Sequence, residues 1–269
     1  MPAEEAAQFL ADSPDRQRLL RHLVESSGSP ADLAENLSLS RRSVQRHLSQ
    51  FADREWARKT DGHYELTVTG ELIVEEHEGY LETLGRIDDL AEFFGHLPDR
   101  EHTPDPRWLD TATVATASPE NPQAPVQHYL NQVRSFETDH IRMISPVLSR
   151  LFQKAHAQLA LQGVHTDLVM DSQTIDRAKE LNPREFDISS SIDVLDIYRY
   201  PDDFAFGLTI GDEQVLMGAY DDDGQLRASV GSTESQFIEW SRQLFEGYRD
   251  RAELVEPALQ LPFSLGNRD

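Results

Sequence analysis

Apolar residues recur at helical spacing in three successive stretches near the start of the chain, residues 15–26, 30–37 and 40–54. The second stretch is short, and a two-residue turn separates it from the third. In the third stretch, apolar residues at i, i+4 and i+7 predict one buried helix face made of Val44, Leu48 and Phe51. The pattern therefore predicts two helices joined by a tight turn, with another helix before them.

Capping residues mark where these helices begin. Ser29 precedes the second helix and Ser40 precedes the third, and a serine hydroxyl at this position accepts a hydrogen bond from a free backbone amide. Ser38 occupies the turn, where glycine is common. Two β-prone runs then flank the Asp-Gly dipeptide at 61–62, which is a strong hairpin signal. A long helical pattern follows over residues 67–90.

The second half of the chain alternates between helical and extended patterns. Six runs between residues 140 and 232 are predicted as strands, and the first three alternate with helices, which is typical of an α/β domain with a mixed sheet. A final helix is predicted from Ser232 to Ala252. The six prolines between residues 98 and 125 indicate a linker before this domain. The expected division of the chain is a first domain over 1–75, a long helix and linker over 76–124, an α/β domain over 125–256 and a tail over 257–269.

Charge is unevenly distributed along the chain. Acidic residues number 48 against 25 basic ones, giving a net charge of −23, and only three of the basic residues are lysines. Such an acidic, lysine-poor composition is typical of a halophilic protein. Residues 38–60 depart from it, with six basic residues against two acidic ones. The chain has no cysteine, no apolar run long enough to span a membrane and no signal-peptide pattern, so a cytoplasmic protein is expected.

The basic residues of this segment fall on one side of the third predicted helix. Two helices joined by a short turn, with the second one basic, are typical of DNA-binding helix-turn-helix proteins. Arginine pairs with guanine and glutamine with adenine in the major groove, while residues on a following hairpin suit phosphate contacts. The residues expected to bind double-stranded operator DNA are Arg41, Arg42, Ser43, Gln45, Arg46 and Ser49 on the helix and Arg58, Lys59 and His63 on the hairpin.

Two parts of the sequence resemble known families. The stretch "ADLAENLSLSRRSVQRHLSQFADREWARKTDGHYELTVTGELI" resembles the winged helix-turn-helix of archaeal transcription regulators. The stretches "VATASPENPQAPVQHYLNQV", "IRMISPVL" and "FIEWSRQLFEGYRDRA" resemble the methanogenesis-regulator (FilR-type) family, which is common in haloarchaea. The resemblance implies an α+β winged helix-turn-helix followed by an α/β effector domain that is phospholipase D-like, as in TrmB-like regulators.

An enzymatic role is not expected for the second domain. Phospholipase D chemistry needs a His-x-Lys motif, and no histidine stands two residues before Lys59, Lys154 or Lys179, so the domain is predicted to be catalytically dead. Serine-hydrolase, P-loop and dinucleotide-binding patterns are also absent. No cofactor and no metal are expected, since the histidines 140, 156 and 165 show neither HxxxH nor HExxH spacing.

A small-molecule effector is expected to bind at the carboxyl ends of strands, where ligands of open α/β sheets usually lie. Ser145 and Asp171 each end a predicted strand just before a helix, and Tyr129 is a third candidate. The alternative is that Ser145 and Asp171 act only as local helix caps.

A homodimer is expected because helix-turn-helix proteins usually bind two half-sites with two-fold symmetry. Phe93, Phe94 and Leu97, at the end of the long helix, are the candidate dimer contact. Two alternatives to a DNA-binding regulator remain open. One is a winged-helix module that binds a protein and no specific DNA, and the other is a DNA-targeted enzyme with a phospholipase D-like fold.

Overall fold

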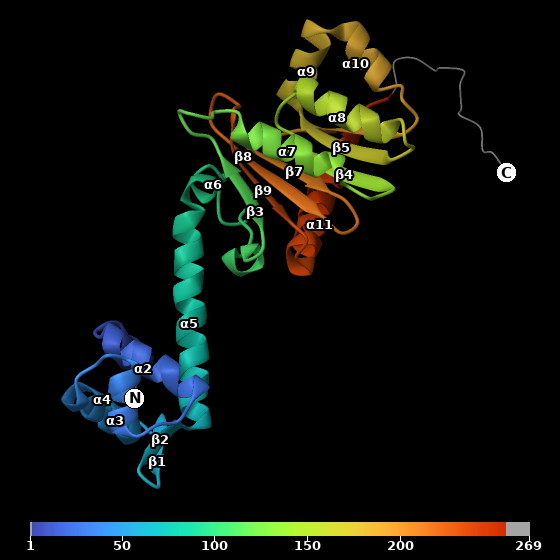
Figure 1. The fold of residues 1–269 in the computed structure, drawn as a ribbon. Coiled ribbons are helices and arrows are strands. Elements are labelled where there is room, and N and C mark those ends of the chain that lie inside the picture. The colour runs from blue at the N-terminus through green and yellow to red at the C-terminus, as the bar shows by residue number, and fades with distance from the viewer. Residues whose placement is uncertain (1, 257–269) are drawn as a thin grey trace, which may run out of the picture. The chain divides into compact units, whose positions relative to one another are not determined.

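The computed structural model describes residues 2–256, apart from the side chain of residue 185, and divides into two compact units (Figure 1). The first unit runs to Gly85 and the second begins at Arg86. This division lies ten residues beyond the expected end of the first domain, inside one continuous helix. The tail expected over 257–269 lies outside the described residues.

The first unit is built from five helices and one hairpin. The elements are α1 (Ala3–Ala11), α2 (Pro14–Glu25), α3 (Pro30–Asn36), α4 (Arg41–Asp53), β1 (Ala57–Thr60), β2 (His63–Leu66) and α5 (Val68–Asp89). This confirms the predicted order of three helices, hairpin and long helix. Helix α1 was not predicted, and it packs into this unit through Phe9, whose ring meets those of Phe51 and Trp56 edge-on.

The core of the first unit lies beneath α4. Val44, Leu48 and Phe51 are all 0% exposed, as their spacing predicts. His47 is also buried, at 1% exposure, and burial lowers the pKa of its imidazole. The core therefore fixes the rotation of α4 about its axis and turns the opposite side of the helix toward solvent.

The turn between α3 and α4 requires a left-handed residue. Ser38 has φ 54°, and its amide donates to the carbonyl of Glu35 at 3.2 Å. The amide of Leu39 donates to the carbonyl of Ala34 at 2.9 Å, which completes a Schellman-type ending of α3. Ser40 then accepts a hydrogen bond from the amide of Ser43 and starts α4.

Replacement of Ser38 tests the turn. Ser38→Gly removes the penalty of a side chain at positive φ, whereas Ser38→Val adds a β-branched side chain there. We expect the free energy of unfolding of the valine variant to lie about 1–2 kcal/mol below that of the glycine variant in denaturant titrations. The same pair at Ser26, whose φ is −158°, should not favour glycine. A valine variant at 38 as stable as the glycine variant would contradict this account of the turn.

The second unit is one mixed sheet with helices on both faces. Its elements are α6 (Ala91–Gly95), η1 (Pro106–Leu109), β3 (Thr113–Thr116), α7 (Ala124–Arg134), β4 (His140–Ile144), α8 (Arg150–Ala160), β5 (His165–Asp171), α9 (Ser172–Leu181), α10 (Pro183–Ser189), β6 (Leu195–Tyr200), β7 (Phe206–Ile210), β8 (Val215–Tyr220), β9 (Leu226–Ser232), α11 (Ser235–Arg249) and β10 (Glu253–Leu254). The strand order is β10-β6-β5-β4-β7-β8-β9-β3, with β4, β5 and β6 parallel and the other pairs antiparallel. The predicted mixed sheet is confirmed.

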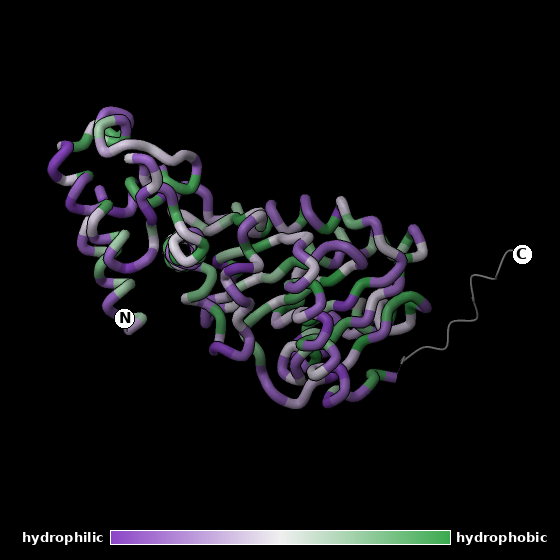
Figure 2. Tube along the Cα trace, turned by 90° about the horizontal axis from the view of Figure 1, so that it is seen from below, coloured by the Kyte–Doolittle hydropathy of each residue, from purple (hydrophilic) through white to green (hydrophobic). Residues whose placement is uncertain are grey.

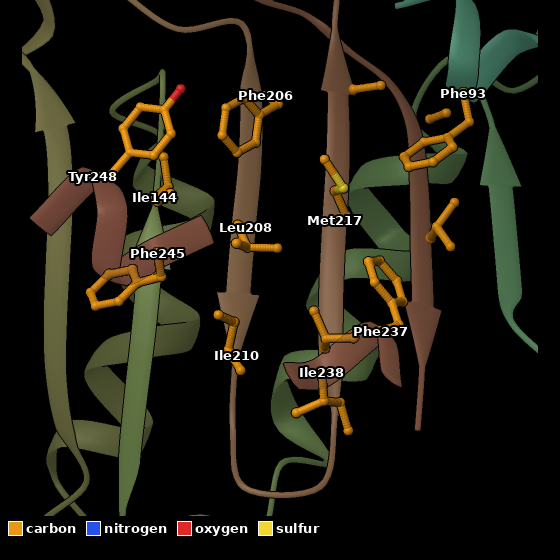
Figure 3. Packing of buried hydrophobic residues seen from close by; sticks show 14 of the residues in the cluster. Phe93, Ile144, Phe206, Leu208, Ile210, Met217, Phe237, Ile238, Phe245 and Tyr248 are labelled. Atoms are coloured by element: carbon orange, nitrogen blue, oxygen red, sulfur yellow. The ribbon is translucent and has the colours of Figure 1, made fainter. Parts of the chain in front are cut away.

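Successive side chains of the strands point to opposite faces of the sheet, and the sheet therefore lies between two hydrophobic cores. Figure 3 shows one of them, in which Ile144, Leu208 and Met217 of the sheet pack against Phe237 and Phe245 of α11. On the opposite face, α7 and α8 cover a second core that contains Met143 and Leu216 from the same strands (Figure 1). The strands therefore carry many of the hydrophobic stretches seen in Figure 2.

Two expectations for residues 93–125 are wrong. Residues Thr113–Thr116 are not linker but edge strand β3, paired antiparallel with residues 228–231 of β9. A strand of only four residues is too short to show a clear alternating pattern, and the neighbouring prolines favoured a linker. Phe93 is 0% exposed and Phe94 and Leu97 pack against the core shared with α11, so they are not an exposed dimer contact. No helix of residues 2–256 is long and apolar enough to cross a membrane.

Candidate nucleic-acid interface

The outward side of α4 carries the residues expected to bind DNA. Arg41, Arg42, Gln45, Arg46 and Ser49 are all exposed. The three arginines form no hydrogen bond or ion pair with any residue of the described chain. Their guanidinium groups are therefore free to bind an external anion or hydrogen-bond acceptor.

Ser43 differs from its neighbours on the helix. It is only half-exposed, its amide donates to the Ser40 hydroxyl at 3.1 Å, and its hydroxyl accepts from the Ser40 hydroxyl at 2.9 Å. These bonds complete the start of α4. Ser43 thus orients the helix N-terminus and keeps one hydroxyl proton available to a ligand.

The hairpin residues are less available than the sequence suggested. Arg58 donates through Nε to Glu65 at 2.7 Å across the two strands, and this contact lowers the pKa of Glu65. Lys59 lies over the Tyr64 ring at 5.6 Å and is exposed. His63 is also exposed, and its Nδ1 lies 3.3 Å from the Asp61 carbonyl. Lys59 and His63 therefore face solvent without an ion pair, whereas Arg58 already has a carboxylate partner.

A second pair of arginines lies at the far end of α4 and was not expected. The guanidinium groups of Arg16 and Arg54 stack on the Phe9 ring, at 3.7 and 3.8 Å from its centroid. Burial and the neighbouring Arg54 charge lower the pKa of Arg16. Arg16 lies on α2 and Arg54 caps α4, so their contacts with the Phe9 ring join α1 to both helices, and no sequence period signals such contacts.

The three residues expected to bind an effector all form hydrogen bonds within the second unit. Tyr129 is buried on α7, where its hydroxyl lies 2.8 Å from Nε2 of His156 and 3.0 Å from the Thr209 hydroxyl. Ser145 donates to the carbonyl of Val147, and Asp171 caps α9 by accepting from Thr174. No hydrogen bond joins Tyr129 to Ser145 or Asp171 in the described chain, so the polar groups of all three are used within the fold.

The Tyr129 network places a neutral histidine in the second unit. Although His156 is only partly buried as a residue, its Nδ1 is enclosed without a partner and its Nε2 meets the tyrosine hydroxyl. Burial lowers the pKa of His156 to about 4 and raises that of Tyr129. Both groups therefore stay uncharged at neutral pH.

This network predicts a pH-dependent stability. Since the pKa of His156 is lower in the folded chain than in the unfolded one, the stabilisation present above pH 6.5 is lost as the pH falls toward 4. We expect the free energy of unfolding to fall by about 1–2 kcal/mol more in the native chain than in His156→Gln between pH 7 and pH 5. Urea titrations at the two pH values measure this difference, and equal losses in both proteins would contradict it.

An open cleft elsewhere in the second unit is a better candidate for a ligand. Its volume is about 850 Å³, and it lies beside the start of α11. Aromatic, charged and amide side chains line it, among them Trp108, Trp240, Arg242, Gln236 and Asp212. Sequence reasoning missed it because Trp108 comes from a segment read as linker.

The histidines named from the sequence fall in two places. His156 belongs to the tyrosine network, whereas His140 and His165 stand opposite each other in the register of β4 and β5. Their ring centroids lie 5.2 Å apart. The parallel sheet thus brings together two histidines that are 25 positions apart in the chain, which no local spacing motif reveals.

Comparisons with known proteins assign each unit to a family. Residues 122–251 match the middle domain of methanogenesis regulatory protein FilR1, and residues 4–89 match the HVO_A0261 N-terminal domain. These two matches confirm the resemblance to the FilR-type family that was expected from the sequence. The match to the FilR1 middle domain lies within the second unit. No curated protein matches the chain.

Solved structures with a similar fold include two kinds of protein. TrmBL2, described as an archaeal chromatin protein with a novel mode of DNA binding, is 13% identical, with 94% of this chain and 100% of that chain covered and a TM-score of 0.42. The phospholipase D family member Nuc from Salmonella typhimurium is 15% identical over 54% of this chain and 99% of its own, also at 0.42. NucT from Helicobacter pylori is 8% identical over 54% and 98%, at 0.44. At these identities and scores the similarities carry no argument about function.

Proposed function

We propose that this chain is a sequence-specific DNA-binding transcription regulator. In this proposal α3 and α4 form a helix-turn-helix, β1 and β2 form its wing, and α4 enters the major groove. The observation that carries the proposal is the set of three exposed arginines on α4, Arg41, Arg42 and Arg46. Within residues 2–256 they form no hydrogen bond or ion pair, although the chain has a net charge of −23.

The contrast with other arginines supports this reading. Most arginines of the described chain form a hydrogen bond or an ion pair with a carboxylate or a carbonyl, namely Arg16, Arg18, Arg21, Arg54, Arg58, Arg86, Arg100, Arg107, Arg142, Arg199, Arg227, Arg242 and Arg249. Unpaired arginine is therefore the exception, and α4 alone holds three of them. A protein partner of similarly acidic composition would also favour this face, but the alternation of Arg with Gln and Ser matches the donors and acceptors of base edges better.

The overall charge affects how such a protein binds. Acidic surfaces elsewhere repel the phosphate backbone, and at molar salt the screening length is only about 3 Å. Long-range attraction then contributes little, so binding depends on direct contacts by α4. On the wing, Lys59 and His63 supply the phosphate contacts, because Arg58 is paired with Glu65.

The second unit is proposed to sense a small metabolite or a protein partner. The cleft beside Trp108, Trp240 and Arg242 supports this role, since it combines aromatic surface with a cation. We propose that this unit has a phospholipase D-like fold without phospholipase D chemistry, because none of the three lysines follows a histidine at the required spacing.

Substitution of the α4 arginines tests the DNA-binding proposal. Arg42→Ala and Arg46→Ala should each weaken binding to genomic fragments recovered with the full chain by roughly ten- to a hundredfold, since a bidentate arginine–guanine contact contributes about 1–3 kcal/mol. Gel-shift titrations at constant salt measure the affinity. Thermal unfolding should be unchanged, because both side chains are exposed.

A matched control is Arg134→Ala in the second unit. Arg134 is exposed at the end of α7 and also forms no hydrogen bond or ion pair within residues 2–256. Its loss removes the same charge, so unchanged DNA affinity is expected. Equal weakening by all three variants would show that only net charge matters, and no weakening by Arg42→Ala or Arg46→Ala would overturn the assignment of α4.

A dimer through α5 is proposed in place of the contact expected at Phe93. Tyr80, Leu84 and Ile87 recur at i, i+4 and i+7 on α5 and are 58%, 45% and 41% exposed. An apolar stripe at this spacing is the seam of a two-helix coiled coil. A second copy of the chain would cover it and give the two-fold symmetry that a palindromic operator requires.

Leu84→Asp should convert the dimer to a monomer, because a carboxylate in an apolar helix seam is left without a partner. Light scattering coupled to size-exclusion chromatography measures the mass of the full chain. The control is Leu161→Asp, at a leucine that is 89% exposed outside α5, which should leave the mass unchanged. A native chain of monomeric mass at high concentration would contradict the proposed dimer.

A further inference from the structure

On the sheet face that α11 covers, the three parallel strands β4, β5 and β6 begin with ionisable residues and continue with apolar ones. Further along each strand this face is apolar, with Ile144 on β4, Val169 on β5 and Tyr200 on β6 in the core shared with α11. At the start of the same strands the face instead carries ionisable and metal-binding side chains: His140 on β4, His165 and Asp167 on β5, and Asp196 on β6.

The side chains of this group meet at close range. Nε2 of His140 lies 3.0 Å from Oδ2 of Asp167, and Nε2 of His165 lies 3.5 Å from Oδ1 of the same carboxylate. The ligand atoms of these three residues all lie within 4.8 Å of one another. Nε2 of His165 also lies 3.1 Å from Oδ2 of Asp196. Two imidazoles and a carboxylate thus form one cluster, and a second carboxylate lies beside it.

These separations match those of a zinc coordination shell. Zinc binds imidazole nitrogen and carboxylate oxygen at about 2.0–2.2 Å in tetrahedral geometry, which puts neighbouring ligand atoms about 3.3 Å apart. Hydrogen bonds of His140 with Asp167, at 3.0 Å, and of His165 with Asp196, at 3.1 Å, already hold pairs of these atoms at a similar spacing. Since sheet hydrogen bonds already fix the strands, an ion would need only side-chain adjustment to bind.

The surroundings also suit a cation. The Asp167 side chain is 8% exposed, and both histidine side chains are 36% exposed, so the site has a buried carboxylate and an opening to solvent. Arg142, the residue opposite Asp167 on β4, directs Nε to Glu246 of α11 at 3.7 Å. Because Arg142 pairs with Glu246, its charge does not neutralise Asp167, and this carboxylate stays available to a cation. Imidazole ligands also favour zinc-class ions over magnesium and calcium, which prefer oxygen alone.

We propose that the second unit binds one zinc-class divalent ion through Nε2 of His140, Nε2 of His165 and the Asp167 carboxylate. Asp196 or a water molecule completes the fourth position. The ion links β4 and β5 directly, and where Asp196 is the fourth ligand it also joins β6 to them. This inference is independent of DNA binding, since the site lies wholly within the sheet of the second unit.

Metal titration of the full chain tests the proposal. Protein stripped with a chelator is titrated with zinc chloride by calorimetry in high salt and excess magnesium, which occupies the many surface carboxylates. We expect one zinc ion per chain at micromolar or tighter affinity, and a thermal midpoint that rises with zinc concentration. The absence of stoichiometric binding by the native chain would overturn the proposal.

Variants locate the ion. His140→Ala and His165→Ala should each weaken zinc binding by at least about a hundredfold, because each removes a direct ligand. Asp167→Asn keeps the shape of the side chain and should weaken it as well. The control is His96→Ala, since His96 stands beside Glu92 at 4.0 Å as a single histidine–carboxylate pair in the same unit. Binding that survives the first three changes, or is lost with His96, would place the ion elsewhere and refute this site.

Cobalt absorption provides a readout that does not depend on whether a variant folds. Cobalt(II) in a four-coordinate nitrogen–oxygen site gives intense visible bands, whereas cobalt held by surface carboxylates and water gives weak octahedral ones. We expect the native chain to develop the intense bands at one equivalent of cobalt and to lose them when zinc is added. Weak octahedral bands alone would contradict a tetrahedral site at His140 and His165.

Discussion

Burial of one apolar stripe on α4 determines which side chains of this helix face solvent. Because Val44, Leu48 and Phe51 are fully enclosed, the helix cannot rotate, and Arg42 and Arg46 on its opposite side must face solvent. The positive φ at Ser38 sets where this helix begins relative to α3. Packing and turn geometry thus position the arginines, and the arginines take no part in holding the fold.

The acidic composition of the chain affects how charged side chains pair in both units. The net charge of the chain is −23, and within residues 2–256 most arginines form a hydrogen bond or ion pair, whereas Arg41, Arg42 and Arg46 on α4 form neither. In the second unit, the same shortage of cations leaves Asp167 paired with the imidazoles His140 and His165. A buried carboxylate beside two imidazoles is also suited to a metal ion. The two proposed binding sites therefore follow from one feature of composition.

Local patterns predicted the local structure well, and long-range contacts less well. The caps at Ser29 and Ser40, the hairpin turn and the six central strands carry their information within a few neighbouring residues, so the sequence was sufficient for them. Strand β3 is too short to show a period, and the burial of Phe93 depends on α11, about 150 positions away. The pairing of His140 with His165 depends on strand register, which no spacing motif encodes. On α4, by contrast, helix periodicity alone separated the buried side from the exposed one.

The central claim is that α4 reads base edges in the major groove from a dimer. Methylation interference on bound genomic DNA tests it most directly, because a methyl group on guanine N7 blocks the atom that an arginine would contact. We expect interference at guanines in two symmetric half-sites about one helical turn, roughly 10 base pairs, apart. Binding that tolerates methylation at every guanine, or interference without two-fold symmetry, would contradict this account.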